Sequence, residues 1–265
     1  MSSTSTPSAV SAILSSYLTQ LRLPAMAASC AAVAREAAAS NLDYLAFLTL
    51  LLGQEVAQRE QTQAARRLLQ AQFPWPKTLD EFDFHLASSV KQAAVLQLAS
   101  GAFVRARENW LVLGGPGVGK THLLCGVGRV LCQHGFRVRF RSAAALVNEL
   151  LLADKEHRLP RLLKQWRSID LFIVDELGYI PFSTVGAQLL FQFFADRHEV
   201  ASVAISSNLE FGRFTEVFHD ERMTAALLDR LTFKSTVMVM EGESYRLKES
   251  LRRQANNEPQ ARQVV

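Results

Sequence analysis

The stretch Gly114–Thr121 reads GGPGVGKT and fits the pattern G-x-x-x-x-G-K-[ST]. An apolar run, WLVL, leads into it, and a run with helical character, HLLCGVGRVLCQH, leads out of it. In such a strand–loop–helix arrangement, successive backbone N–H groups point at one anion, and the helix adds the positive end of its dipole. A glycine-rich turn that matched by coincidence would not be expected to have both neighbours. The motif therefore predicts an α/β fold with a P-loop that binds phosphates.

Each part of this motif has an expected role in binding ATP and Mg²⁺. Its four glycines allow backbone conformations that are closed to residues with a Cβ atom. Lys120 is expected to reach the β- and γ-phosphates, and the Thr121 hydroxyl is expected to bind Mg²⁺. The residues expected to contact the nucleotide are Gly114, Gly115, Pro116, Gly117, Val118, Gly119, Lys120, Thr121 and His122.

Two later strand ends carry polar side chains that suit the same site. The apolar run LFIV leads directly into Asp175 and Glu176. Ligands of open α/β sheets bind at the carboxyl ends of strands, so we expect Asp175 to hold Mg²⁺, mostly through water, and Glu176 to act as the base. Asn208 ends the run SVAISSN and is expected to hold the attacking water. For all three, an ordinary polar turn at a strand end is the alternative.

The order of apolar runs predicts the fold class and the domains. Strand-like runs cover residues 110–115, 137–143, 170–177, 202–208 and 236–242, and three of them are almost wholly apolar. Such runs are typical of parallel strands buried on both faces, so we expect a parallel five-stranded sheet covered by helices. Residues 1–73 read as a small all-helical domain with a loose start, and the prolines of residues 74–84 mark a linker. An ATPase domain over 85–251 and a disordered tail over 252–265 complete the expected organisation.

Composition excludes several classes of protein. Apolar residues make up 49% and charged residues 20% of the 265 residues, as in soluble globular proteins. The three cysteines have no metal-ligand spacing, so neither a disulfide framework nor a zinc site is expected. The chain begins without the pattern of a secretory signal, and Leu45–Leu52 is too short to span a bilayer. We therefore expect a cytoplasmic location and no membrane partner.

Positive charge is concentrated in one part of the chain. The net charge is +4, and residues 129–167 hold nine basic side chains against three acidic ones. Lys155, Arg158, Arg161 and Lys164 recur at a spacing that would place them on one face of a single helix. Such a face suits contacts with the DNA backbone rather than with bases. The alternative is a solvated basic helix.

Several segments together resemble one family. They are LRLPAMA, TLDEFDF, GGPGVGKTHL, LFIVDELGYIPF, ISSN, LLDRL and GESYRLKES. The chain resembles, from about Leu21 to Leu251, the IstB-like ATPases, which are helper proteins of insertion sequences. That family is similar to the DnaC-type helicase loaders of the AAA+ initiator branch. The P-loop is generic, whereas VDELGY and GESYRLKE are much more specific to this family.

The resemblance implies further features of the site. It implies an AAA+ P-loop core with the sheet order 5-1-4-3-2 and no large C-terminal lid. Asn208 would be the sensor-1 residue, and Arg230 of LLDRL would complete the site of a neighbouring subunit. Arg222 is a second candidate for that role, and the alternative for Arg230 is a surface arginine paired with Asp229 or Glu221. The segment with Phe82 and Phe84 would lie near the adenine, where packing between linker and core is the expected role of both rings.

The function implied by the resemblance is ATP-dependent help in transposition. The subunits would self-associate on duplex DNA and deliver or remodel that DNA for the transposase of the same insertion sequence. ATP hydrolysis would reset the assembly, with Glu176, Lys120, Asn208 and Arg230 as the catalytic set and slow turnover by the monomer. A DnaC-like replicative helicase loader is the first alternative. The second is a scaffold that binds nucleotide without hydrolysing it.

Overall fold

The chain divides into two compact units. The computed structural model describes residues 9–87, 89–242 and 244–245, so the expected tail over 252–265 lies outside the described residues. The contacts within the chain define one unit up to Ala65 and another from Arg66 onward. We call the described parts of these units the helical unit and the sheet unit. Nowhere in these described ranges is there a helix both long enough and apolar enough to cross a bilayer.

The helical unit consists of helices and short turns. Its elements are α1 (Ala9–Gln20), α2 (Pro24–Ala39) and the greater part of α3 (Tyr44–Ala71). Pro24 occupies the first turn of α2, where its missing N–H does no harm. A small core of buried side chains holds the three helices together, and it contains Leu18, Met26, Val33 and Leu51.

A buried carboxylate joins α2 to α3 inside this unit. Glu55 of α3 is only 3% exposed, and its Oε2 accepts hydrogen bonds from the N–H groups of Ala25 (2.9 Å) and Met26 (3.1 Å). The N-cap residue of α2, Leu23, has no side-chain cap of its own. The Arg59 guanidinium donates to the other carboxylate oxygen at 2.9 Å. Glu55 therefore supplies, from another helix, the cap that the start of α2 lacks.

The sheet unit contains five parallel strands in the order β2-β3-β4-β1-β5. This is the predicted order 5-1-4-3-2 counted from the opposite edge, so the prediction is confirmed. The strand bounds agree with the predicted runs to within two residues. The strands are β1 (Asn109–Gly114), β2 (Val138–Ser142), β3 (Leu171–Leu177), β4 (Ser202–Ser207) and β5 (Ser235–Met240).

The three central strands, β3, β4 and β1, each contribute to two cores, one on each face of the sheet. Phe172 and Val174 of β3 face one core, and Leu171 and Ile173 face the other. This alternation follows from the period of two along a strand. It explains why β3 reads as a continuous apolar run: both of its faces are covered.

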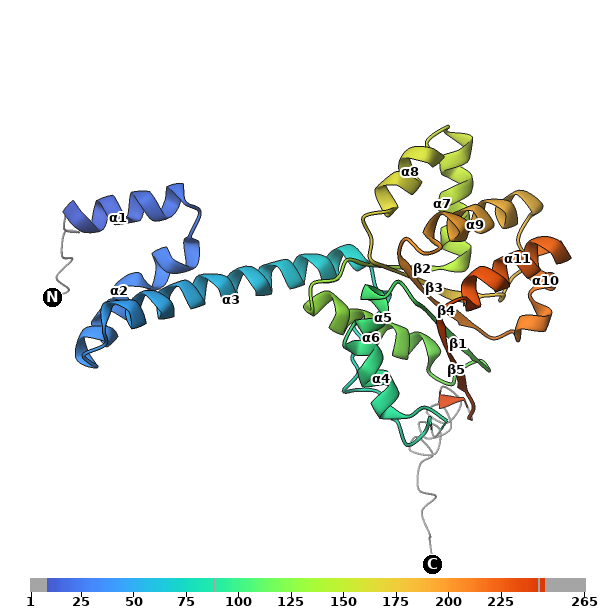
Figure 1. Cartoon of the computed structure of the whole chain (residues 1–265), viewed down its shortest axis with the longest axis horizontal. Coiled ribbons are helices and arrows are strands. Elements are labelled where there is room, and N and C mark those ends of the chain that lie inside the picture. The colour runs from blue at the N-terminus through green and yellow to red at the C-terminus, as the bar shows by residue number, and fades with distance from the viewer. Residues whose placement is uncertain (1–8, 88, 243, 246–265) are drawn as a thin grey trace, which may run out of the picture. The chain divides into compact units, whose positions relative to one another are not determined.

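Helices cover both faces, as Figure 1 shows. One face carries α4 (Gln92–Ala99), α5 (Ala102–Arg105) and α6 (Lys120–Gln133). The other carries α7 (Ala143–Lys155), α8 (Leu159–Trp166), α9 (Thr184–Arg197), α10 (Thr215–Phe218) and α11 (Glu221–Thr232). The 3-10 turn η1 (Phe211–Arg213) precedes α10, and the described residues between α3 and α4 form turns. The carboxyl ends of all five strands meet at one edge of the sheet, which is where the site is built.

Candidate nucleotide site

The P-loop connects β1 to α6, as the motif predicts. Gly119 is the N-cap of α6 and has a φ of 102°, a left-handed conformation that strongly favours glycine. Gly115 differs from the expectation for the motif glycines, because it has no positive φ and a Cβ there would meet open space. The first turn of α6 therefore begins at Lys120, with its free N–H groups at the mouth of the loop.

A cavity of about 460 Å³ lies beside this loop. Its lining includes P-loop residues 116–122, and the strand ends contribute Glu176, Ser206 and Asn208. The remaining lining comes from the linker, the chain after β3 and the chain after β5, with Trp75, Lys77, Glu81, Phe82, Asp83, Leu86, Ala87, Tyr179 and Tyr245. The cavity thus brings the phosphate loop together with Glu176 and Asn208 from the strand ends and with Phe82 from the linker, all of which the sequence singled out.

Lys120 lies folded against its own loop. Its Nζ donates hydrogen bonds to the carbonyl oxygens of Gly114 and Gly115, both at 2.7 Å. These two carbonyls carry only partial negative charge, whereas a phosphate carries full charge and forms stronger, charge-assisted hydrogen bonds. The ammonium group is therefore held at the loop, in reach of an anion bound there.

Asp175 and Thr121 form a pair of oxygen ligands beside the loop. The Thr121 Oγ1 lies 3.1 Å and 2.9 Å from the two carboxylate oxygens of Asp175. Asp175 is only 4% exposed, and the Ser206 hydroxyl donates a hydrogen bond to its Oδ1. A hydroxyl and a carboxylate are the hard oxygen donors that Mg²⁺ prefers, and one or two such protein ligands are what it needs beside phosphates. This donor set therefore fits Mg²⁺.

A change of register at the end of β3 gives the neighbouring residues Asp175 and Glu176 different environments. The pairing of β3 with β4 shifts between Val174 and Leu177, and Glu176 has a φ of 59°. A left-handed conformation in a residue other than glycine is strained and is common at functional sites. The Glu176 N–H donates to the Ser206 Oγ at 2.9 Å, which stabilises this turn. As a result, Asp175 is buried towards Thr121 while Glu176 is exposed and lines the cavity.

Asn208 lines the same cavity from the end of β4. Its position is held by the preceding residue, because the Ser207 hydroxyl donates to the Leu177 carbonyl at 2.7 Å and accepts from the Leu209 N–H at 3.0 Å. An exposed carboxylate and an exposed amide therefore share one cavity with the phosphate loop. This arrangement is able to bind a water molecule and remove its proton. The individual roles of Glu176 and Asn208 stay predictions.

Aromatic residues surround the linker side of the cavity. Phe82 packs edge-on against Phe84 and against the His122 imidazole, with ring centroids 4.8 Å and 5.3 Å apart. The His122 Nε2 lies 2.8 Å from the Thr78 carbonyl oxygen, a bond that needs the proton on Nε2. Burial lowers the pKa of His122, which favours the neutral ring. Phe82 and Phe84 join the core cluster as expected, and Phe82 also faces the cavity.

Among the cavity-lining residues that the sequence did not single out are three aromatic residues and one serine. Trp75, Tyr179 and Tyr245 are each about half exposed or more, and Ser206 is buried between Asp175 and Glu176. The motif GESYRLKES pointed to the region of Tyr245, although most of that motif lies outside the described residues. Nothing in the sequence pattern singled out Ser206, because its position depends on the register between β3 and β4.

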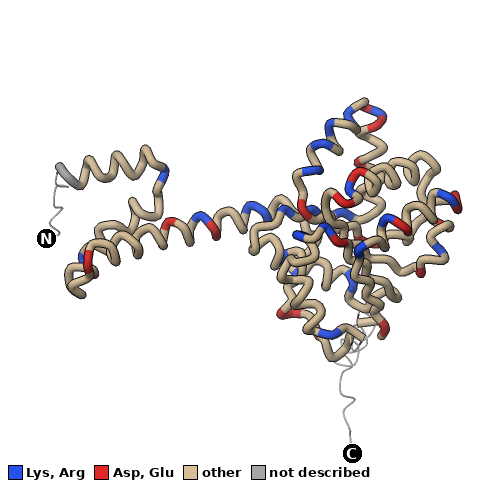
Figure 2. Tube along the Cα trace, viewed as in Figure 1, with Lys and Arg blue, Asp and Glu red and all other residues tan. Residues whose placement is uncertain are grey.

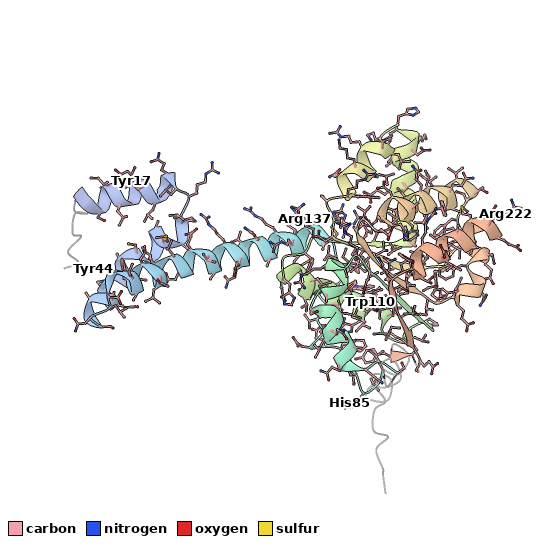
Figure 3. The ribbon with its side chains drawn as sticks, viewed as in Figure 1. Tyr17, Tyr44, His85, Trp110, Arg137 and Arg222 are labelled. Carbon is pink, nitrogen blue, oxygen red and sulfur yellow. The ribbon has the colours of Figure 1, made fainter. Side chains whose placement is uncertain are left out.

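Neither candidate arginine lines the cavity of its own chain. The Arg230 guanidinium lies 4.8 Å from the centroid of the Phe191 ring in α9. Within the described ranges, no ion pair joins Arg230 to Asp229 or Glu221. The end of its helix is held by buried Asn109, whose Nδ2 donates to the Leu231 carbonyl at 3.1 Å. Arg222 is exposed near the start of the same helix and is labelled in Figure 3.

The four basic residues proposed to contact DNA do not lie on one helix. The predicted arrangement on a single helix is therefore wrong, whereas the DNA contact itself stays a prediction. Lys155 ends α7, His157 has a φ of 56°, and α8 begins only at Leu159. The reason is local: the left-handed residue ends the first helix, and Pro160 is accepted only in the first turn of a new one. Arg158 precedes α8 and pairs with Glu156.

The remaining two, Arg161 and Lys164, do share the exposed side of α8. Its opposite side buries Leu159, Leu163 and Trp166 in the core. Figure 2 shows the basic positions gathered over α8 and the adjoining turn. All four basic side chains are exposed, so the surface is basic, but it is formed by two helices and the turn between them.

Comparison with known proteins agrees with this arrangement. The model of the IstB-like ATP binding protein family matches residues 16–253. An ATP-binding protein of insertion sequence IS21 from Pseudomonas aeruginosa is 39% identical over 232 residues, which cover 88% of each chain. An ATP-binding protein of insertion sequence IS5376 from Geobacillus stearothermophilus is 36% identical over 233 residues, which cover 88% of this chain and 93% of the relative.

A solved structure shares the fold of the sheet unit. AMPPCP-bound DnaA from Aquifex aeolicus is similar with a TM-score of 0.55 and 16% identity, over 72% of this chain and 58% of that one. The present chain therefore spans little more than half of DnaA, and the likeness concerns the AAA+ fold alone. Because the family model covers nearly the whole chain and the relatives match along almost their full length, the chain belongs to the family of IstB-like ATP binding proteins.

Proposed function

We propose that this protein is an ATP-hydrolysing, DNA-binding helper of transposition. One observation carries the proposal: a single cavity joins a phosphate loop, a Mg²⁺-compatible pair and an exposed carboxylate with an amide. The relatives that support the biological context are named as ATP-binding proteins of insertion sequences. In this proposal ATP controls self-association on duplex DNA, and the assembly presents that DNA to the transposase of the same insertion sequence.

The chemistry follows from the side chains around the cavity. The N–H groups of the P-loop and the Lys120 ammonium bind the β- and γ-phosphates and orient them. Thr121 and Asp175 would hold Mg²⁺, which when bound neutralises charge on the phosphates. Glu176 removes a proton from the attacking water, and Asn208 holds that water without competing for the metal. The strained turn at Glu176 keeps its carboxylate in the cavity instead of beside Asp175.

The site is completed by a second subunit in this proposal. Among the residues that the structure describes, no arginine lines the cavity, and Arg230 lies over Phe191 on another side of the sheet unit. An arginine that stabilises charge on the transferred phosphoryl group would therefore come from a neighbour. For that reason we expect slow hydrolysis by the monomer and faster hydrolysis in the assembly.

DNA binding in this proposal uses phosphate contacts. The exposed basic surface formed by Lys155, Arg158, Arg161 and Lys164 supplies positive charge without any element that suits reading of bases. Binding of this kind depends steeply on salt and weakly on sequence. The basic surface formed by the end of α7, the following turn and α8 is thus the DNA surface of the proposal.

Electron microscopy of the protein with duplex DNA tests the proposal. We expect ordered assemblies on DNA with ATP, and few or none with ADP or without nucleotide. Assemblies that form equally well in all three conditions would overturn the role of ATP as the assembly switch. A DnaC-like helicase loader remains the alternative: it would bind a replicative helicase and would show no ATP-dependent assembly on duplex DNA.

A further inference from the structure

The chain that follows β5 returns to the P-loop. We call residues 241–242 and 244–245 the closing segment. At its start, the Glu241 N–H donates to the Ser89 Oγ at 2.9 Å, and the Ser89 hydroxyl donates to the Glu241 carbonyl at 3.3 Å. At its end, the Tyr245 N–H donates to the Gly117 carbonyl at 3.1 Å. The closing segment is therefore attached at one end to the chain before α4 and at the other to the phosphate loop.

The contact with the P-loop is close enough to require a glycine. Gly117 has a φ of 80°, and a Cβ atom built there would collide with the Ser244 Oγ and lie 2.9 Å from the Ser244 Cβ. Two independent reasons, backbone conformation and the approach of Ser244, therefore exclude a side chain at this position. The closing segment and the middle of the phosphate loop thus form one packed unit.

The order of the strands decides from which side Tyr245 enters the cavity. β5 pairs with one edge of β1, and β4 pairs with the other. The closing segment follows β5, whereas Glu176 and Asn208 follow β3 and β4. Tyr245 therefore reaches the cavity from the side opposite the expected catalytic residues, with the P-loop between them.

The surroundings of Tyr245 suit a nucleoside. The chain before α4 contributes Trp75, Phe82, Leu86 and Ala87 to the same cavity, so this side offers aromatic and apolar surface. Tyr245 is 48% exposed although its backbone is fixed to Gly117. An anchored backbone with an accessible ring is preorganised for stacking, because little freedom is lost when a ligand binds.

We propose that Tyr245 is a nucleotide-binding residue whose ring packs against the nucleoside of a bound purine nucleoside triphosphate. The inference rests on the proposed function, because it assumes that the triphosphate occupies the P-loop. It adds a second anchoring point for ATP: the loop holds the phosphates and the closing segment holds the nucleoside. Through the Gly117 bond, the two anchoring points are mechanically connected.

Binding measurements with two ligands test this proposal. Isothermal titration calorimetry of the full chain would compare the affinity for Mg·ATP with the affinity for Mg·tripolyphosphate, which has the phosphates but no nucleoside. In Tyr245→Ala we expect about tenfold weaker binding of ATP, as for loss of one aromatic stack, and unchanged binding of tripolyphosphate. Tyr245→Phe keeps the ring and should bind ATP within about twofold of the wild type. Tyr17→Ala, at an exposed tyrosine of the helical unit, is the matched control.

Each other outcome contradicts the proposal. Unchanged ATP affinity in Tyr245→Ala would show that the ring does not contact the nucleotide. Equal weakening for both ligands would assign Tyr245 to the shape of the P-loop instead of the nucleoside. A loss in Tyr245→Phe as large as in Tyr245→Ala would assign the effect to the hydroxyl. If the wild type bound neither ligand, the proposed function itself would fail.

Discussion

At the scale of single residues, one serine organises the candidate catalytic turn. The Ser206 hydroxyl donates to Asp175 and accepts from the Glu176 N–H, so it holds two neighbouring acidic residues in different directions. Without such a support, the left-handed conformation of Glu176 would carry an uncompensated cost of about 1–3 kcal/mol. A buried hydroxyl therefore fixes which acid meets Thr121 and which faces the cavity.

Glu176→Gln should separate ATP binding from hydrolysis. Glutamine keeps the size and the hydrogen bonding of the side chain but cannot accept the proton, so turnover should fall about 100-fold or more. Affinity for ATP should stay within a few-fold, and the ATP-bound assembly should accumulate. Glu199→Gln is the matched control, because Glu199 is also an exposed glutamate with a left-handed backbone. Turnover close to that of the wild type would remove Glu176 from catalysis.

Glu55→Gln should loosen the start of α2 in a pH-dependent way. Burial alone raises the pKa of the Glu55 carboxyl, but the Met26 N–H, the Arg59 guanidinium and the Ala25 N–H outweigh it, so the pKa lies below its ordinary value. A carboxyl with a lowered folded pKa stabilises the fold above its unfolded pKa and loses this effect as the pH falls through the folded one.

Hydrogen exchange of the full chain measures this effect locally. At neutral pH the amides at the start of α2 should exchange faster in Glu55→Gln than in the wild type. The difference should shrink in acid, as the wild-type carboxyl becomes protonated. Glu60→Gln, an exposed position of the same helix, should behave as the wild type. A difference that persists unchanged into acid would contradict a charged cap.

At the scale of elements, the break between α7 and α8 changes the nature of the basic surface. The four basic residues recur at helical spacing, yet His157 and Pro160 divide them between two helices and a turn. The two that remain on one helix, Arg161 and Lys164, are carried by α8, whose buried side is fixed in the core. Because α8 is firmly packed, substitution of Arg161 or Lys164 tests DNA binding with little effect on the fold.

Charge reversal on α8 should weaken DNA binding and lower its salt dependence. Arg161→Glu and Lys164→Glu, each alone, should reduce duplex affinity several-fold and lower the slope of log K against log salt by about one. Fluorescence anisotropy with a labelled duplex at several salt concentrations measures both quantities. Lys91→Glu, with the same change of charge at an exposed position before α4, is the control. An unchanged slope would mean that α8 is a solvated basic helix that does not contact DNA.

At the scale of the whole molecule, the chain supplies a cavity and an arginine that do not meet. The cavity is formed at the carboxyl ends of the strands, and Arg230 stacks on α9 instead of facing it. In a head-to-tail assembly, one surface of a subunit meets a different surface of the next, so each site is able to combine residues of two chains.

Mixing two inactive variants tests this arrangement. Lys120→Ala loses phosphate binding in its own cavity but keeps Arg230, whereas Arg230→Ala keeps the cavity. When they are mixed in equal amounts, about a quarter of the sites would pair an intact cavity with an intact neighbouring arginine, so ATPase activity should reappear. A mixture of Lys120→Ala with Glu176→Gln should stay inactive, because both lesions lie in the cavity. If Arg230→Ala is active alone, while Arg222→Ala is inactive alone and regains activity when mixed with Lys120→Ala, the role passes to Arg222.

The sequence by itself determined what depends on neighbouring residues in the chain. The P-loop, its flanking strand and helix, and the placement of Asp175 and Asn208 at strand ends were all readable, because motif spacing and hydrophobic period are local signals. The order of the strands came from the family resemblance and was confirmed by the pairing in the sheet.

The tertiary structure alone decided how distant segments meet. The shift of register between β3 and β4 places Ser206 between two acids, and the position of β5 beside β1 brings Tyr245 to the phosphate loop. The packing of α11 on α9 keeps Arg230 away from its own cavity. These features depend on strand register and helix packing, which are set by contacts between residues far apart in the chain, so no local pattern records them.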